Sequence, residues 1–279
     1  MNYYLGLLLF FAFLGVAGLL IYIFIYYRKR KELQKILSLE FKQEYRQYLQ
    51  NTPHYKNLPA EDKQKIERSI LLFIHTKEFI GVGIDVTDEM KIITAFYACL
   101  LLLKKDTIHN CYENLQTIVI YPSAVAFERV AQNGGIYTKE KFLIDGQAAN
   151  DTVIIIWHDA KKEAYHLRHE NVIIHEFAHE IDFMDGVVDG IPPLERSKYD
   201  EWAKILYRDY KKLQKIAFKN REWGKYKLLG AYAATNEAEF FAVLTERFFQ
   251  SPKSLQRHFP ELYKELKDFY GIDPVKLVA

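Results

Sequence analysis

The chain has 279 residues, of which 49% are hydrophobic and 15% aromatic. This composition excludes a disordered chain and is typical of a packed core. There are 38 Lys and Arg residues against 36 Asp and Glu, a net charge of +2 that indicates neither a nucleic acid nor another strongly charged partner. The length suits a membrane anchor followed by one sizeable globular domain. The two cysteines, Cys99 and Cys111, match no zinc or redox motif, and such sparse usage is typical of a reducing compartment.

The N-terminal segment is apolar enough to span a membrane. Residues 3–27, "YYLGLLLFFAFLGVAGLLIYIFIYY", contain no charged side chain and no amide, and a helix of this length exceeds a bilayer core of roughly 30 Å. The basic tetrapeptide "RKRK" follows at residues 28–31, which places the N-terminus outside and the rest of the chain in the cytoplasm. A cleaved signal peptide is disfavoured, because its basic residues would precede the apolar run. Residues 1–27 are therefore predicted to be a single-pass anchor in the cell (inner) membrane.

The next segment, residues 28–50, is predicted to be a basic juxtamembrane helix or stalk. Apolar residues recur at helical spacing over residues 32–50, from Leu33 to Tyr48. That helix could pack on the globular domain or lie on the lipid surface, and the spacing does not distinguish the two. The domain itself is predicted to occupy residues 51–279, beginning with an extended loop over residues 51–59.

The domain reads as helix-rich α+β with a small sheet. Helices are expected over residues 60–76, from residue 88 onward with Thr87 as N-cap, from a capping-box-like Ser197 and Asp200 to about residue 219, and over residues 236–249 and 260–270. The sheet is expected from "TIVIY" at residues 117–121 and "TVIIIW" at residues 152–157, separated by a glycine-containing loop at residues 131–147.

The stretch "NVIIHEFAHEID", residues 171–182, carries the strongest chemical signal. His175 and His179 lie four residues apart, so on a helix their imidazoles stand one above the other and can bind one ion. This H-E-x-x-H layout is typical of zinc hydrolases, in which the glutamate, here Glu176, acts on the metal-bound water. Asn171 is the expected N-cap of the helix and Gly186 its expected stop. The alternative is a surface helix in which the two histidines coincide by chance.

A hydrolytic zinc needs three protein ligands and one open position. The stretch "GAYAATNEAEFFAVLTERFF", residues 230–249, offers Glu237, Glu239 and Glu246 as candidates for the third ligand. An acid on an apolar helix face is costly to bury unless it is paired or bound to metal, whereas a solvated glutamate needs no such role. Glu237 and Glu239 lie about 200° apart around a helix axis, so both cannot face one ion. The residue pattern leaves the choice among the three open.

Several motifs resemble those of the zinc-dependent peptidases related to Mlc titration factor A. They are "GVGIDVTDEMK", "ACLLLL", "IVIYPSAVAF", "NVIIHEFAHEID", "DGIPPL" and "AYAATNEAEFFAVLTERFF", spread over about residues 51–275. In its site that family is similar to the protease domain of anthrax lethal factor, in which a tyrosine precedes the third-ligand glutamate by seven residues. The resemblance implies a zincin-like fold of the gluzincin type.

The resemblance also assigns roles to individual residues. It implies that Zn²⁺ is held by His175, His179 and Glu239, and that Glu176 is the general base. Tyr232 would donate a hydrogen bond to the developing oxyanion. Asp182, which follows the second histidine, would orient a ligand imidazole.

The predicted function is that of a membrane-anchored zinc-dependent peptidase, which hydrolyses peptide bonds with a zinc-bound water and a glutamate general base. Its expected partners are a peptide or protein substrate, extended along a sheet edge such as "TVIIIW", and the membrane. The resemblance also implies an alternative. In it, the domain is a regulatory module that sequesters a partner protein, such as a transcriptional repressor, with weak or regulated peptidase activity. A purely structural membrane-tethered module is the third possibility.

Overall fold

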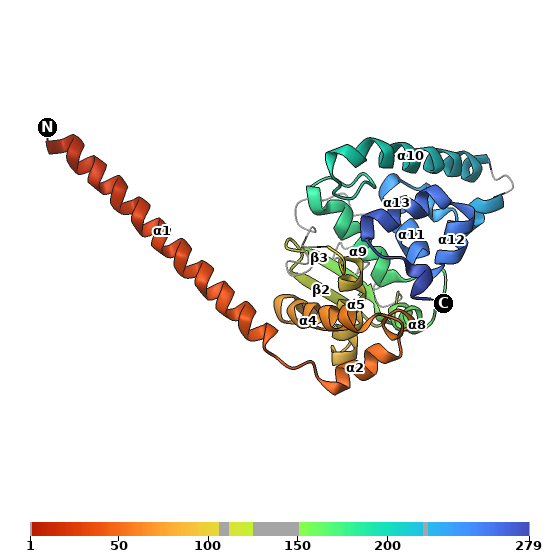
Figure 1. The fold of residues 1–279 in the computed structure, drawn as a ribbon, viewed down its shortest axis with the longest axis horizontal. Coiled ribbons are helices and arrows are strands. Elements are labelled where there is room, and N and C mark those ends of the chain that lie inside the picture. The colour runs from red at the N-terminus through yellow and green to blue at the C-terminus, as the bar shows by residue number, and fades with distance from the viewer. Residues whose placement is uncertain (1, 106–111, 125–150, 220–222, 279) are drawn as a thin grey trace. The chain divides into compact units, whose positions relative to one another are not determined.

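The computed structural model describes residues 2–105, 112–124, 151–219 and 223–278 (Figure 1). The chain divides into two compact units, Met1–Glu40 and Phe41–Ala279. The glycine-containing loop expected at residues 131–147 lies outside the described residues, as does Cys111.

The first unit is a long helix, α1, which runs from Asn2 to Leu37. The apolar side chains of its membrane-span candidate, such as Leu8 and Phe24, are exposed. A helix of this length is about 54 Å long, more than a bilayer core requires. The structure thus contains one N-terminal helix that is long and apolar enough to cross a membrane.

The single helix predicted over residues 32–50 is wrong, because the chain leaves α1 after Leu37 and forms a separate helix α2, Gln43–Gln50. Phe41 and the α2 residues Tyr45 and Leu49 are buried, and α2 contacts α5. The helically spaced apolar residues at the C-terminal end of this segment therefore pack within the second unit. The extended loop predicted over residues 51–59 also contains a short helix, α3, Pro53–Lys56, which starts with proline at a favourable position.

Within the described residues, the sheet has three parallel strands in the order β1-β2-β3. These are β1, Glu78–Gly81; β2, Thr117–Tyr121; and β3, Thr152–Ile156. In the register, Thr117 of β2 lies opposite Glu78 of β1 and Thr152 of β3. Strands β2 and β3 were predicted, but the second prediction extended to Trp157, which is the first residue of helix α8 in the structure. Strand β1 was not predicted, because four residues are too few to show a periodicity.

Most predicted helices are present. In the part of the second unit that the structure describes, the other α-helices are α4, Ala60–Thr76; α5, Asp88–Leu101; α8, Trp157–Tyr165; α9, Val172–Asp182; α10, Arg196–Lys219; α11, Glu237–Gln250; α12, Pro252–His258; and α13, Pro260–Tyr270. The Thr87 hydroxyl accepts the Met90 backbone N–H at 3.3 Å, as its expected N-cap role requires. Helix α10 begins at Arg196, so the start predicted from Ser197 and Asp200 is wrong, although its end at Lys219 is correct.

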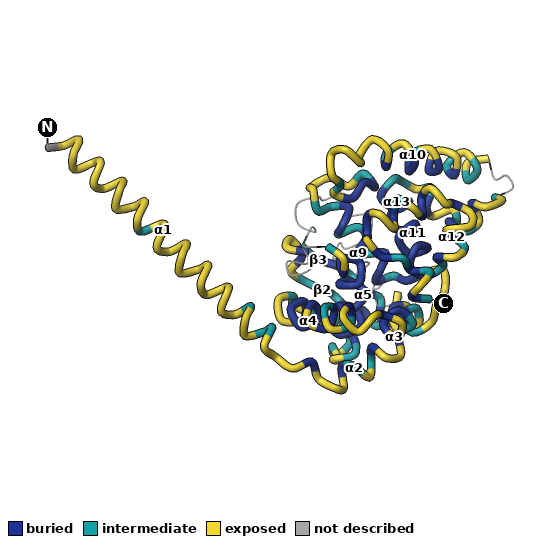
Figure 2. The backbone as a smooth tube through the Cα atoms, viewed as in Figure 1, coloured by how far each residue is buried: buried dark blue, intermediate teal, exposed yellow. Residues whose placement is uncertain are grey.

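Two buried helices form the centre of the second unit. Helix α9 contacts β3 and α11, and residues Ala238 to Gln250 of α11 are all buried. Figure 2 shows these buried stretches, together with α5, inside a shell of exposed residues. Two helices far apart in sequence are thereby held in fixed positions against each other, which is what a precise site needs.

Candidate metal centre

Helix α9 presents both histidines of the H-E-x-x-H motif on one side. Asn171 caps the helix, since its side-chain oxygen accepts the Ile174 backbone N–H at 3.0 Å. Phe177 and Ile181 are fully buried on the packed side. After α9 a short 3₁₀ turn, η2 (Phe183–Asp185), leads to Gly186, where φ is +88° and the helical path ends as predicted.

Helix α11 brings a carboxylate to these imidazoles. Asn236 caps α11 by accepting the Glu239 backbone N–H at 2.8 Å. The Glu239 oxygen Oε2 lies 3.0 Å from His175 Nε2 and 3.5 Å from His179 Nε2. His175 is only 6% exposed and Glu239 only 5%, so these two side chains are largely shielded from water, whereas His179 is of intermediate burial. Of the three glutamates that the sequence left open, Glu239 is the one that reaches both histidines.

The donor set of this cluster fits a metal ion. One ligand atom from each of His175, His179 and Glu239 lies within 4.8 Å of the others. The two Nε2 atoms face each other at 3.2 Å, while the other His175 ring nitrogen, Nδ1, lies 2.6 Å from a Glu246 oxygen. If Nδ1 carries the proton of neutral His175, the Nε2 atom of His175 has a free lone pair, and this lone pair points at a carboxylate and a second imidazole. Such a convergence of acceptors is satisfied by a cation, and two imidazoles with one carboxylate suit zinc.

The local field favours positive charge at this point. Burial by itself lowers the pKa of His175, but its hydrogen bonds to Glu239 and Glu246 outweigh burial and raise the pKa to about 10. Burial raises the pKa of Glu239, and the two histidines reverse this and hold it well below its usual range. The carboxylates that attract a proton here would equally favour a divalent cation.

The other two glutamates of the stretch have different surroundings. The Glu237 carboxylate lies 3.6 Å from Lys211 Nζ on α10, on a partly exposed surface. Glu246 is buried and bonds to His175 through Nδ1 rather than Nε2. Sequence reasoning kept Glu246 as one of three candidates for the third ligand, whereas in the structure its carboxylate contacts the far ring nitrogen of His175. The available signal was an acid seven residues beyond Glu239 on a mostly apolar helix.

Tyr232 lies beside the cluster in a short 3₁₀ segment, η4, Tyr232–Ala234. Its ring centroid is 5.9 Å from that of His175, and the residue is 51% exposed. Because η4 is separate from α11, Tyr232 and Glu239 are not neighbours along one helix face, and a chain turn brings them together. Partial burial and then the nearby Glu239 carboxylate raise the pKa of Tyr232 above its usual value, so the hydroxyl keeps its proton.

Asp182 is fully buried at the end of α9, and its Oδ2 accepts the Gly190 backbone N–H at 3.0 Å. Burial raises its pKa to about 7. Gly190 adopts φ of +78°, and a Cβ there would come within 2.4 Å of the Glu237 carbonyl oxygen. Only glycine therefore lets this loop join the end of α9 to the start of α11. The Nδ1 atom of His175 contacts Glu246, and the role of Asp182 in orienting a ligand imidazole stays a prediction.

Comparison with known proteins assigns the chain to a protein family. Residues 26–271 match the model of the glucose-regulated metallopeptidase M90 family. The chain belongs to this family. The matched segment contains α9, η4 and α11, and hence all the residues of the cluster.

Several known proteins are moderately similar to this chain over most of its length. An uncharacterized protein of Synechocystis sp. is 33% identical over 80% of this chain and 81% of its own length. Mlc titration factor A of Serratia proteamaculans is 30% identical over 69% of this chain and 73% of its own. Mlc titration factor A of Yersinia pestis is 27% identical over 81% and 83%. The resemblance to peptidases related to Mlc titration factor A is thus confirmed, and the M90 family to which the chain belongs is a metallopeptidase family.

Proposed function

We propose that this M90 protein is a zinc-dependent peptidase with a gluzincin-type site in a zincin-like domain. The observation that carries the proposal is the convergence of His175, His179 and Glu239, from two helices, on one point that two buried side chains and one partly exposed side chain enclose. Those three residues would hold the zinc, with Nε2, Nε2 and a carboxylate oxygen as ligands.

The remaining residues fit the hydrolysis of a peptide bond. A zinc ion in such a site lowers the pKa of its bound water from ~15.7 toward ~7. Glu176 follows the first ligand on α9 and would accept the proton of the attacking water, then pass it to the leaving amine. Tyr232, with its protonated hydroxyl beside the cluster, would donate a hydrogen bond to the carbonyl oxygen as negative charge develops there.

The substrate would lie along β3. Among the described residues β3 is a terminal strand of the sheet, and it contacts the metal helix α9. An extended peptide can pair with the free backbone groups of such a strand, which brings successive peptide bonds past the metal. The exposed apolar helix α1 would anchor the enzyme in the membrane, with the second unit in the cytoplasm.

The test uses the full-length protein in detergent micelles. Zinc content and peptide hydrolysis are measured for the wild type and for Glu176→Gln. The wild type should bind one zinc and hydrolyse peptides. Glu176→Gln should keep zinc and the fold but lose nearly all turnover, by about 10²-fold or more, because the base is gone while the ligands remain. Near-normal turnover in the variant would refute the assigned mechanism.

A regulatory role is the second candidate, since several relatives bear the name Mlc titration factor A. In that role the domain would sequester a partner protein, and peptidase activity would be weak or regulated. Wild-type protein that binds zinc but hydrolyses no peptide, and Glu176→Gln that still captures the partner, would favour this function over the first.

A further inference from the structure

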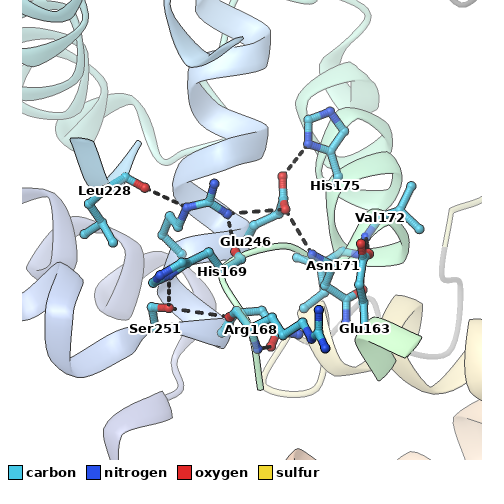
Figure 3. Close-up of polar contacts among 12 residues, drawn as sticks. Glu163, Arg168, His169, Asn171, Val172, His175, Leu228, Glu246 and Ser251 are labelled. Carbon is cyan, nitrogen blue, oxygen red and sulfur yellow. Dashed lines mark hydrogen bonds and ion pairs between the residues drawn. The ribbon is translucent and has the colours of Figure 1, made fainter. Parts of the chain in front are cut away.

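The carboxylate of Glu246, on α11, contacts both His175 and the residue at the start of α9, the helix that carries His175 (Figure 3). One oxygen, Oε1, lies 2.6 Å from His175 Nδ1. The other, Oε2, accepts the Asn171 backbone N–H at 3.0 Å. One side chain of α11 therefore contacts both the N-cap residue of α9 and the imidazole that α9 presents.

The surroundings of Glu246 hold its carboxylate in place. Glu246 is 5% exposed on a helix that is otherwise mostly apolar, where an unpaired acid would be costly. Arg247 Nη1 lies 3.5 Å from Oε2. The Arg247 guanidinium is itself fixed by the Leu228 carbonyl oxygen at 2.8 Å and by the His169 carbonyl oxygen. The carboxylate thus has a charged neighbour and two hydrogen-bond donors, and little freedom to turn away from His175.

We propose that Glu246 is a positioning residue for the metal centre. Its carboxylate keeps the His175 proton on Nδ1, so that the Nε2 lone pair faces His179 and Glu239. Because the same carboxylate also accepts the backbone N–H of the N-cap residue of α9, the Glu246 carboxylate fixes both the His175 imidazole and the start of the helix that carries it. The inference rests on the proposed zinc site, and it concerns Glu246 alone.

A charged hydrogen-bond acceptor behind a ligand imidazole also makes the imidazole a better donor to the metal. Loss of such a partner typically costs about 10- to 100-fold in metal affinity. Glu246→Gln keeps the size of the side chain and one acceptor oxygen but removes the charge. The variant should therefore bind zinc about 10- to 100-fold more weakly than the wild type.

Glu163 offers a matched control at the same helix start. Its Oε2 accepts the Val172 backbone N–H at 2.7 Å, one residue beyond the bond that Glu246 makes. Its hydrogen bond goes to the helix backbone and not to an imidazole of the cluster (Figure 3). Glu163→Gln thus removes a carboxylate from the N-terminus of α9 without touching the ligand.

The experiment compares full-length wild type, Glu246→Gln and Glu163→Gln in detergent micelles. Zinc affinity is measured by chelator competition at neutral pH, and the thermal midpoint is measured on metal-free protein. Glu246→Gln should lose zinc affinity as stated, and Glu163→Gln should keep the wild-type affinity. Equal zinc affinity in wild type and Glu246→Gln would overturn the proposal, as would an equal loss in both variants, which would indicate a general effect on α9.

A second measurement needs no folded variant of Glu246. Histidine ¹⁵N NMR of zinc-loaded wild type shows which nitrogen of His175 carries the proton, with the signal assigned by its loss in His175→Ala. A proton on Nδ1 is expected, and a proton on Nε2 would overturn the proposal. If wild-type protein binds no zinc, both this inference and the proposed peptidase fail. If it binds zinc but Glu246 has no effect, only the inference fails.

Discussion

At the scale of single residues, two glutamates that lie two positions apart in the sequence have different surroundings. Glu239 is buried against both histidines, whereas Glu237 pairs with Lys211 at a partly exposed surface. We therefore expect Glu239→Ala to reduce zinc content strongly and Glu237→Ala to leave it nearly intact. Zinc content is measured by elemental analysis of purified full-length protein.

Each variant is a control for the other, because each replaces a glutamate in the first turn of α11 with alanine. Zinc retained in Glu239→Ala but lost in Glu237→Ala would mean that the third ligand is misassigned. Zinc retained in both would direct attention to Glu246 as a ligand rather than a positioning residue.

Tyr232 allows a separate test of the reaction itself. Tyr232→Phe removes only the hydroxyl from a half-exposed ring, so the fold and the zinc content should persist. Removal of an oxyanion donor typically costs about 10²- to 10³-fold in kcat, and we expect a loss near the lower end because the residue is partly solvated. Steady-state hydrolysis of a peptide measures the effect. Loss of zinc along with activity would show instead that Tyr232 maintains the site structure.

At the scale of elements, the junction of α8 and α9 contains an acid with a shifted pKa. Burial raises the pKa of Glu163 from 4.5 to about 7, its bond to the Val172 N–H opposes this in part, and the charges of Glu246, Asp159 and Glu170 add to it. The folded state therefore binds this proton more tightly than the unfolded state. The stabilisation is complete below pH 4.5 and is lost as the pH rises through about 7.

Comparison with Glu163→Gln isolates this group, because glutamine does not titrate. The thermal midpoint of metal-free wild type, relative to that of the variant, should fall as the pH rises from about 4.5 to about 7. Fluorescence-monitored melting at several pH values measures the difference. A constant difference across this window would show that Glu163 has a normal pKa in the folded protein.

At the scale of the whole molecule, α1 has exposed apolar side chains and is long and apolar enough to cross a membrane, and we expect it to anchor the protein there. A basic run directly follows the apolar span, so we expect the second unit to lie in the cytoplasm. A reporter that is active only in the cytoplasm, fused after Ala279, should be active, and a matched reporter that is active only after export should be silent. The opposite pattern would overturn the orientation, and a soluble full-length protein would overturn the anchor.

Local sequence determined those features that depend on neighbours along the chain. The i,i+4 histidines, the Asn171 cap and the Gly186 stop are all contained within α9, and the apolar run of α1 needs no partner to be recognised. The bounds of α4 and α13 were predicted for the same reason, since helical periodicity and capping act within a few residues.

Only the tertiary structure decided what depends on distant segments. It brought Glu239, which the residue pattern left open and the resemblance had implied, to both histidines, separated α2 from α1, and added β1 to the sheet. Glu246 meets His175 across 71 residues of sequence, because α11 and α9 pack side by side. No local pattern contains such a contact, since burial and pairing of an acid are set by the element that packs against it.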